Sequence, residues 1–487
     1  MKKSVTSNII YNMLFQFFTT FLPIITTPYL SRTLGVNQSG VFSFVETIVT
    51  MFTIFGSIGT SLYGCRKVAY VRDDKEKLSQ TTYEIFLLKL VLLIPICVIY
   101  IIFFCLTGEY RIYFWINMFT VIGSMIEISW FFNGVEDFKL VTIRNFIVKI
   151  VFIICLFIFI KKPEDLGKYV ALVCVSNFLG NVSMWFCLKE YLYPFKSLGK
   201  LHPFKHLKES FVLFIPQSAN YVYSLSDKAM LGYLTPTLDN VGIYDYSYRI
   251  VKMIVSVLQS IGYVILSRIA NLSSKNNKDE IGKYINKSIY FTFFLGFPMT
   301  FRLIGIANIF VPLYLGDEFL EVSKVLLIIS PLVLLTSFNS VLGVQLLLAV
   351  KMDKQYTIAT VIGAIINISL NFLLIPWWGI YGACITSLIS EIIVLIFQLY
   401  FAKEYVSLKK VLWENRKVIF SSVIMFIFCK CIGYMNAHVV IVLLCQMAIS
   451  VVVYFGLIFL LKDKLFREIL NKILAILNIE YKFKEKV

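Results

Sequence analysis

Residues 439–461 read VVIVLLCQMAISVVVYFGLIFLL, 23 positions without a charged side chain. A helix of this length crosses about 30 Å of bilayer hydrocarbon. Comparable apolar runs fall at residues 8–30, 40–62, 82–106, 112–134, 142–160, 168–190, 210–234, 241–267, 286–310, 321–349, 356–375, 380–402 and 418–435. The sequence therefore predicts an all-α integral membrane protein with about 14 transmembrane helices.

The composition of the whole chain excludes the other main classes of protein. Its 487 residues are 58% hydrophobic and 15% charged, and the mean hydropathy is +0.79. Soluble domains carry about 25% charged residues, and an outer-membrane barrel alternates polar and apolar residues in blocks of about ten. The ten cysteines are scattered without a C-x-x-C pair, so we predict no metal site and no disulfides.

The basic residues predict how the chain is oriented. With the N-terminus in the cytoplasm, 33 of the 46 Lys and Arg residues fall in inner segments and 5 in outer loops. Cytoplasmic loops of membrane proteins carry an excess of Lys and Arg, so this asymmetry predicts that both termini are cytoplasmic. Basic loops beside anionic lipid also account for the net charge of +17 without a nucleic-acid partner.

An internal repeat predicts two lobes. Gly40-Val41-Phe42 opens the second apolar run and Gly242-Ile243-Tyr244 opens the eighth, 202 residues later. The loops that follow begin at Arg66 and Arg268, again 202 apart. Each copy holds six helices, and an even number returns the chain to the same side of the membrane. The two lobes should therefore be parallel, around a central cavity.

The predicted organisation follows from the repeat. We expect an N-lobe (1–190), a cytoplasmic linker (191–209), a C-lobe (210–402), and two further helices with a basic cytoplasmic tail (403–487).

Polar stripes on apolar helices indicate faces that are turned away from lipid. The predicted cavity-lining residues are Asn8, Asn12, Gln16, Gln217 and Asn220.

Charges inside the predicted spans are the strongest functional signal, because an Arg or Lys at the bilayer centre costs about 2.5–3.5 kcal/mol. Lys89, Lys149 and Lys324 lie close enough to predicted helix ends to extend their ammonium groups to the interface. The deeper cations Arg249, Lys252 and Arg302, with Lys228 nearer the outer edge, are the predicted substrate-binding residues. The embedded carboxylates are Glu46, Glu127, Asp227, Asp245 and Glu391.

Two blocks of sequence carry a resemblance to a known family. The first runs from Ile24 to Gly35, which reads IITTPYLSRTLG, and continues at Gly40–Phe44. The second is Asp227–Leu234, followed by Val241–Tyr244 and Arg249–Lys252. Together these blocks resemble the lipid-linked oligosaccharide flippases of the multidrug/oligosaccharidyl-lipid/polysaccharide exporter superfamily.

This resemblance implies translocation of a polyprenyl-diphosphate-linked oligosaccharide across the bacterial cytoplasmic membrane, by alternating access, for O-antigen or capsule synthesis. It implies a cationic cavity for the diphosphate, which falls on Lys228, Arg249 and Lys252 in this sequence. The implied partners are the lipid-linked glycan, membrane lipids, and a polysaccharide polymerase or glycosyltransferases. We expect no catalytic residues and no bound cofactor.

Two other functions remain open from the residues alone. A cation-coupled drug or metabolite antiporter of the same superfamily would favour an acidic cavity, whereas the deep pair Arg249 and Lys252 is basic. A membrane glycosyltransferase or polymerase would need a sizeable outer loop, and the longest outer connections here are only about ten residues. If a proton or a sodium ion drives transport, Asp227 and Asp245 are the first candidates for its site, because they lie nearest the cations. The alternative is that both are permanent partners of Lys228 and Arg249.

Overall fold

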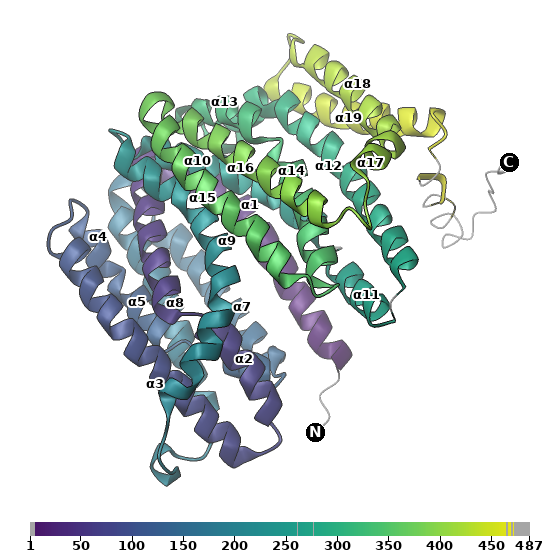
Figure 1. Ribbon diagram of the computed structural model, residues 1–487. Coiled ribbons are helices and arrows are strands. Elements are labelled where there is room, and N and C mark those ends of the chain that lie inside the picture. The colour runs from purple at the N-terminus through teal and green to yellow at the C-terminus, as the bar shows by residue number, and fades with distance from the viewer. Residues whose placement is uncertain (1–4, 261, 276, 464–465, 469–470, 472–487) are drawn as a thin grey trace. The chain divides into compact units, whose positions relative to one another are not determined.

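The computed structural model describes residues 5–260, 262–275, 277–463, 466–468 and 471. Side chains at residues 5–21 and at some later positions, Gln217 and Asn220 among them, lie outside the described part. The described backbone is helical throughout, without strands (Figure 1). Within the described residues, each predicted apolar run overlaps one or more helices.

The described chain divides into two compact units. The first unit holds residues 1–245 and 367–383, and the second holds 246–366 and 384–487. The helices that begin before residue 246 are α1 (Val5–Ser57), α2 (Thr60–Val71), α3 (Lys75–Tyr100), α4 (Arg111–Ile116), α5 (Met118–Met125), α6 (Ser129–Gly134), α7 (Phe138–Phe159), α8 (Leu166–Leu188), α9 (Leu207–Leu234) and α10 (Asp239–Gln259).

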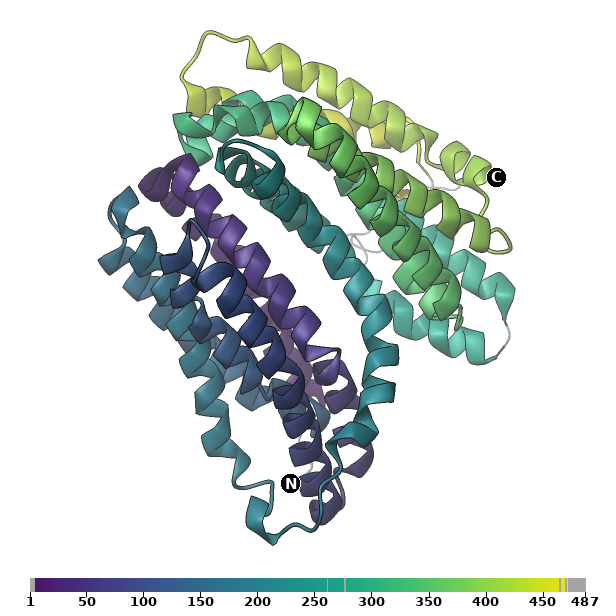
Figure 2. The ribbon, with the colours of Figure 1, turned by 60° about the vertical axis from the view of Figure 1, so that its left-hand side comes forward.

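The remaining helices are α11 (Gly262–Ser274), α12 (Lys278–Leu315), α13 (Leu320–Ile329), α14 (Leu332–Ser340), α15 (Asp353–Trp378), α16 (Ile380–Phe401), α17 (Leu408–Glu414), α18 (Arg416–Gly433) and α19 (Val439–Leu460). Figure 2 shows the C-terminal helices α18 and α19 packed beside α12 in the second unit. The end of α15 and the start of α16 belong to the first unit.

In the described part of the chain, nine helices are long and apolar enough to span a membrane, or ten if the bent pair Asp317–Ile329 and Leu332–Leu348 forms one span. The protein is thus a multi-pass membrane protein, while the arrangement of 14 spans in two lobes stays a prediction. Two predicted spans, at residues 8–30 and 40–62, merge into α1, which leaves helical geometry at Gly35 (φ 74°).

Helix ends repeat with the same offset as the sequence. Helix α1 ends at Ser57 and α2 begins at Thr60, while α10 ends at Gln259 and α11 begins at Gly262. Both pairs of ends are 202 residues apart, which is the offset of the sequence repeat. The break after α1 contains Ile58 and Gly59, both with positive φ.

Repeat-related residues also contact one another in the first unit. A Cβ added at Gly40 would lie 2.0 Å from the carbonyl oxygen of Leu238, and one added at Gly242 would lie 2.7 Å from that of Val36. Leu238 is Val36 plus 202, so the contact is reciprocal, as across a two-fold axis. Glycine permits this close backbone approach because it has no side chain.

The linker segment before α9 is held to the first unit by a buried carboxylate. Glu84 of α3 is fully buried and accepts hydrogen bonds from His206 Nε2 (3.0 Å), the His202 backbone N–H (2.9 Å) and Lys205 Nζ (2.7 Å). On its other side, the His206 Nδ1 atom lies 2.7 Å from the Tyr63 hydroxyl. The imidazole thus joins the linker to both α2 and α3.

Acidification should weaken this attachment. Burial lowers the pKa of His206 below its usual 6.5, although Glu84 opposes the shift. The folded protein therefore favours neutral imidazole, and the stability that His206 contributes is complete above about pH 6.5 and declines as the pH falls below that value. We expect the melting temperature in detergent to fall between pH 7.5 and pH 5.5, and to fall less in His206→Gln. Equal slopes for the parent and the variant would contradict this prediction.

Candidate functional site

A buried ion pair lies in the first unit. Lys89 Nζ lies 2.9 Å from Glu127 Oε2 and 3.0 Å from the Glu127 carbonyl oxygen, and the Lys89 side chain is 2% exposed. The prediction that Lys89 extends to the membrane interface is therefore wrong. Helix α3 begins at Lys75 rather than near residue 82, so Lys89 lies almost four turns from its start.

Glu127 occupies a break in the predicted span 112–134, which the structure divides into α4, α5 and α6. Its carboxylate accepts hydrogen bonds from the Ser129 backbone N–H (2.8 Å), the Ser129 hydroxyl and the Ser61 hydroxyl (3.3 Å). The carboxylate thus begins α6 while it neutralises Lys89. A buried charge with this many partners is fully satisfied.

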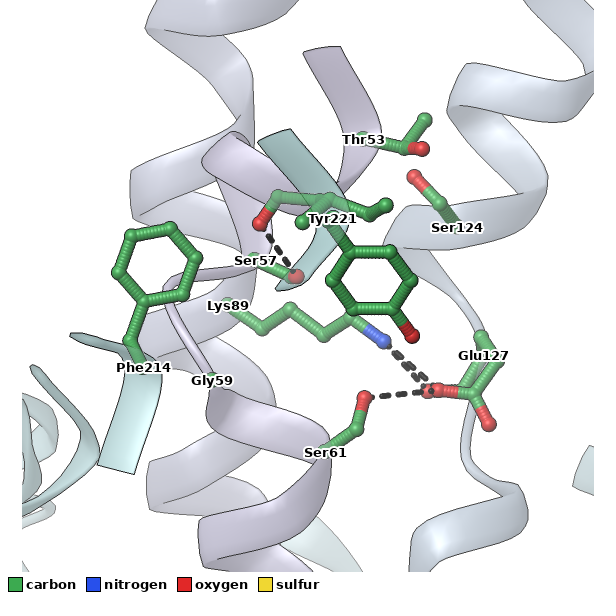
Figure 3. Close-up of a pocket in the computed structure, with 10 residues that line it drawn as sticks. Thr53, Ser57, Gly59, Ser61, Lys89, Ser124, Glu127, Phe214 and Tyr221 are labelled. Atoms are coloured by element: carbon green, nitrogen blue, oxygen red, sulfur yellow. Dashed lines mark hydrogen bonds and ion pairs between the residues drawn. The ribbon is translucent and has the colours of Figure 1, made fainter. Parts of the chain in front are cut away.

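The ion pair borders a polar cavity of about 240 Å³, which we call the first-unit cavity. Figure 3 shows the Lys89 ammonium, the Glu127 carboxylate and several hydroxyls gathered around it. The lining residues are Thr53, Ile54, Ser57, Gly59, Ser61, Lys89, Ser124, Glu127, Phe214 and Tyr221. Hydroxyls both donate and accept hydrogen bonds, so this lining suits a neutral polyhydroxylated group or ordered water.

A second polar group of the first unit surrounds Asp227, and we call it the Asp227 cluster. Asp227 Oδ1 accepts hydrogen bonds from Asn367 Nδ2 (2.9 Å) and Asn371 Nδ2 (2.6 Å), and Oδ2 accepts one from the Tyr244 hydroxyl (2.6 Å). The Ser226 hydroxyl donates to Asn367 Oδ1 at 2.8 Å. All five side chains are buried. This burial makes the Asp227 carboxylate a charge that water does not solvate.

Lys228, the next residue of α9, pairs with α10. Its Nζ lies 3.1 Å from Asp245 Oδ1, and both side chains are largely buried. Lys228 thus forms an ion pair with a neighbouring carboxylate, as the structural alternative predicts, and that carboxylate is Asp245.

The second unit holds a buried carboxylate with neutral partners. Glu391 of α16 is buried, and the Asn339 side-chain amide donates both to its carboxylate and, at 3.0 Å, to its carbonyl oxygen. The Thr336 hydroxyl donates to Glu391 Oε1 at 3.2 Å. The Glu391 side chain, whose orientation the sequence does not predict, thus faces α14 inside the second unit.

The other predicted site residues are less enclosed. Arg249 is half-buried and Lys252 is exposed on α10, Arg302 is half-buried on α12, and Glu46 is half-buried on α1. Arg249 and Lys252 are three residues apart and share a helix face.

The side chains of Asn8, Asn12, Gln16, Gln217 and Asn220 lie outside the described residues. Among the residues that the structure describes, no group of three or more His, Cys, Asp or Glu residues has the geometry of a metal site.

Sequence reasoning missed Asn367, Asn371 and the partners of Lys89. The two asparagines are four residues apart in an otherwise apolar run, so the sequence could have predicted that they share a helix face. Nothing in the sequence indicates that this face meets Asp227, because 140 residues separate Asp227 from Asn367.

Comparison with protein families identifies the chain. The family described as "Polysaccharide biosynthesis protein" matches residues 5–273, which is more than half of the sequence. This chain belongs to the polysaccharide biosynthesis protein family. The MatE family also matches, over residues 213–373. Both matches confirm the predicted superfamily of multidrug, oligosaccharidyl-lipid and polysaccharide exporters, whose members are membrane transporters rather than enzymes.

Two curated relatives of this polysaccharide biosynthesis protein carry transport names. A protein of Escherichia coli K12 named an O-antigen transporter is 26% identical over 82% of this chain and 97% of its own length. A protein of Haloferax volcanii named a low-salt glycan biosynthesis flippase is 28% identical over 39% of this chain and 40% of its own length.

Solved structures show the same fold. The lipid II flippase MurJ, in an inward closed conformation, superposes with a TM-score of 0.76 at 17% identity and covers 94% of this chain and 100% of its own. An inward-facing multidrug transporter of the MATE family gives a TM-score of 0.61 at 14% identity, over 80% of this chain and 95% of its own. These likenesses confirm an all-helical membrane fold of the MurJ and MATE kind.

Proposed function

We propose that this protein moves a polyprenyl-diphosphate-linked oligosaccharide from the inner to the outer leaflet of the bacterial cytoplasmic membrane, for surface polysaccharide synthesis. The match with the polysaccharide biosynthesis family over residues 5–273 carries this proposal. The names of the relatives support it, since they describe an O-antigen transporter and a glycan flippase. Buried charges in apolar helices support it as well, because they are costly unless they serve a polar pathway.

The proposed role of each group of residues follows from its chemistry. Lys228, Arg249, Lys252 and, as an auxiliary, Arg302 bind the anionic diphosphate, which needs several positive charges in a medium of low dielectric constant. The hydroxyls of the first-unit cavity exchange hydrogen bonds with the sugar. The site's exposure alternates between the two membrane faces, as in other transporters of repeated architecture.

Removal of the two α10 cations should stop export. In a strain that lacks its own glycan transporter, the parent chain should restore surface polysaccharide, and the double variant Arg249→Ala, Lys252→Ala should not. Lys324→Ala is the matched control, because Lys324 is exposed and pairs locally with Glu321. Full restoration by the double variant, at equal protein level, would refute the assigned role of these cations.

The same proposal places both termini and the linker in the cytoplasm. In a cysteine-free version of the chain, a single cysteine introduced by Gly199→Cys should react with an impermeant thiol reagent only after the membrane is opened. Labelling in intact cells would contradict the inward orientation.

We propose further that a proton or a sodium ion couples to transport at Asp227. The buried Asp227 carboxylate accepts hydrogen bonds from the amide N–H groups of Asn367 and Asn371 and from the Tyr244 hydroxyl. Its oxygens are acceptors for a proton, and carboxylate oxygens are also ligands that hard cations prefer. Asp245 is the second candidate, and its pairing with Lys228 gives it the more structural role. Glu127 ranks behind them because it already neutralises Lys89, and Glu46 and Glu391 are the remaining candidates.

A cation-coupled antiporter is the second candidate function. The MatE match over residues 213–373 and the MATE structural likenesses favour it. Such a protein should protect cells from organic cations, whereas the proposed flippase should not.

A further inference from the structure

A separate basic cavity lies between α2 and the start of α9 in the first unit. Its volume is about 470 Å³. Four of its lining residues form one face of α2, at spacings of three and four, and four come from the first two turns of α9. They are Tyr63, Arg66, Lys67, Tyr70, Lys208, Glu209, Val212 and Leu213. None of these residues belongs to the first-unit cavity or to the Asp227 cluster.

The charge of this basic cavity is positive. Arg66, Lys67 and Lys208 face one carboxylate, that of Glu209. Lys67 Nζ lies 3.7 Å from Glu209 Oε2, and both side chains remain partly in solvent, so this pair is weak. Neither Arg66 nor Lys208 forms an ion pair with a carboxylate of the described residues. Two positive charges are therefore left over.

Arg66 is oriented for an anionic ligand. Its Nε donates to the Tyr70 hydroxyl at 3.2 Å, and the guanidinium lies 5.8 Å from the centre of the Tyr70 ring. These contacts hold one side of the guanidinium and leave its terminal N–H groups for an acceptor. A guanidinium binds phosphate oxygens with two parallel hydrogen bonds.

Exposed apolar side chains border the basic cavity. Tyr70 and Val212, which line it, are 70% and 60% exposed, and Phe211, which precedes Val212 in the chain, is 50% exposed. A cationic hollow beside exposed apolar groups, on a side predicted to face the cytoplasm, matches the interface between lipid head groups and acyl chains.

We propose that this basic cavity binds the phosphate head group of a lipid. Arg66 and Lys208 contact the phosphate oxygens, and the apolar border contacts the chain. The lipid is either the polyprenyl diphosphate carrier, which rests on the proposed function, or an anionic phospholipid of the inner leaflet. Both offer the same chemistry.

Photo-crosslinking of the full-length protein tests this site. The protein is reconstituted in phosphatidylcholine vesicles that contain a photoactivatable phosphatidylglycerol or, separately, a photoactivatable polyprenyl diphosphate. The adducts are mapped by mass spectrometry. In the parent, adducts should fall within residues 60–71 and 207–213. In the variant Arg66→Gln, Lys208→Gln they should drop about tenfold, as expected when charged hydrogen bonds are lost.

The matched control is Lys196→Gln, Lys200→Gln, which removes the same charge from exposed linker positions outside the basic cavity. It should change the adducts less than about twofold. A photoactivatable phosphatidylcholine, whose phosphate charge is balanced by its own choline group, reports contact that needs no net negative charge, and its adducts should be the same in all three proteins.

The two probes distinguish the source of the phosphate. Loss of polyprenyl diphosphate adducts assigns the basic cavity to the carrier, and loss of phosphatidylglycerol adducts alone assigns it to a resident phospholipid. Adducts of both probes that persist in the Arg66→Gln, Lys208→Gln variant, or that are missing from these segments in the parent, would overturn the proposal. No translocation is measured, so a protein that fails to move a glycan can still pass this test.

Discussion

Replacement of Lys89 by methionine should destabilise the protein by about 3–5 kcal/mol, because it leaves the Glu127 carboxylate without its cation in a buried site. Methionine preserves most of the side-chain volume, so the loss reports charge rather than packing. The measurement is the fraction of monodisperse protein that survives heating in detergent, followed by fluorescence-detected gel filtration.

The double variant Lys89→Met, Glu127→Gln tests whether the loss is due to the unpaired charge. It removes both charges, and the amide introduced at position 127 can keep the hydrogen bonds to Ser129 and Ser61. It should recover most of the lost stability. Lys410→Met serves as the control, because the side chains of Lys410 and of its ion-pair partner Glu414 are both exposed. A Lys89→Met variant as stable as the parent would mean that the ion pair is not formed in the membrane.

Replacement of Gly40 by alanine should have an effect as large or larger. The new Cβ would lie 2.0 Å from a backbone oxygen, that of Leu238, so no rotamer change can relieve the clash. The backbones of α1 and α10 must separate, and the hydrogen bond from Asn37 Nδ2 to Asp239 Oδ1 (2.9 Å) is lost with them. We expect little folded protein after membrane extraction.

Substitutions at two further glycines provide a parallel test and a control. Gly242→Ala should behave like Gly40→Ala, because the contact is reciprocal. Gly456→Ala, on α19, is the control, since no atom lies within 4 Å of its added Cβ. Alanine favours helix by about 1 kcal/mol over glycine, so this variant should be as stable as the parent or slightly more so. A fully folded Gly40→Ala protein would contradict the close crossing.

The positions of helices were predictable from this sequence because apolar length and repeat spacing are local properties. The offset of 202 that joins Gly40 to Gly242 also predicts where α1 and α10 end. Prediction was weaker at helix breaks. The run 112–134 looks continuous, yet a break lies at Glu127, whose carboxylate accepts a hydrogen bond from the first N–H group of α6, that of Ser129, and pairs with the Lys89 ammonium.

Partnerships between side chains were harder to predict. Asp245 and Lys228 were both predicted site residues. The sequence allowed several ion pairs among the embedded charges, and the pair of Lys228 with Asp245 was one of them. The environment of Asp227 depends on Asn367 and Asn371, which reach it from a helix 140 residues away. The depth of Lys89 was misjudged because hydropathy placed the helix start too late, and an error of two turns changes an interfacial lysine into a buried one.

Transport in reconstituted vesicles tests the central proposal most directly. The purified protein is placed in proteoliposomes with a fluorescent polyprenyl-diphosphate-linked oligosaccharide, and an impermeant reagent that destroys the label measures how fast the lipid reaches the opposite leaflet, with and without an imposed pH or sodium gradient. We expect translocation well above that of protein-free vesicles, a response to one gradient in the parent, and no such response in Asp227→Asn. Translocation equal to that of protein-free vesicles under every gradient would contradict the account.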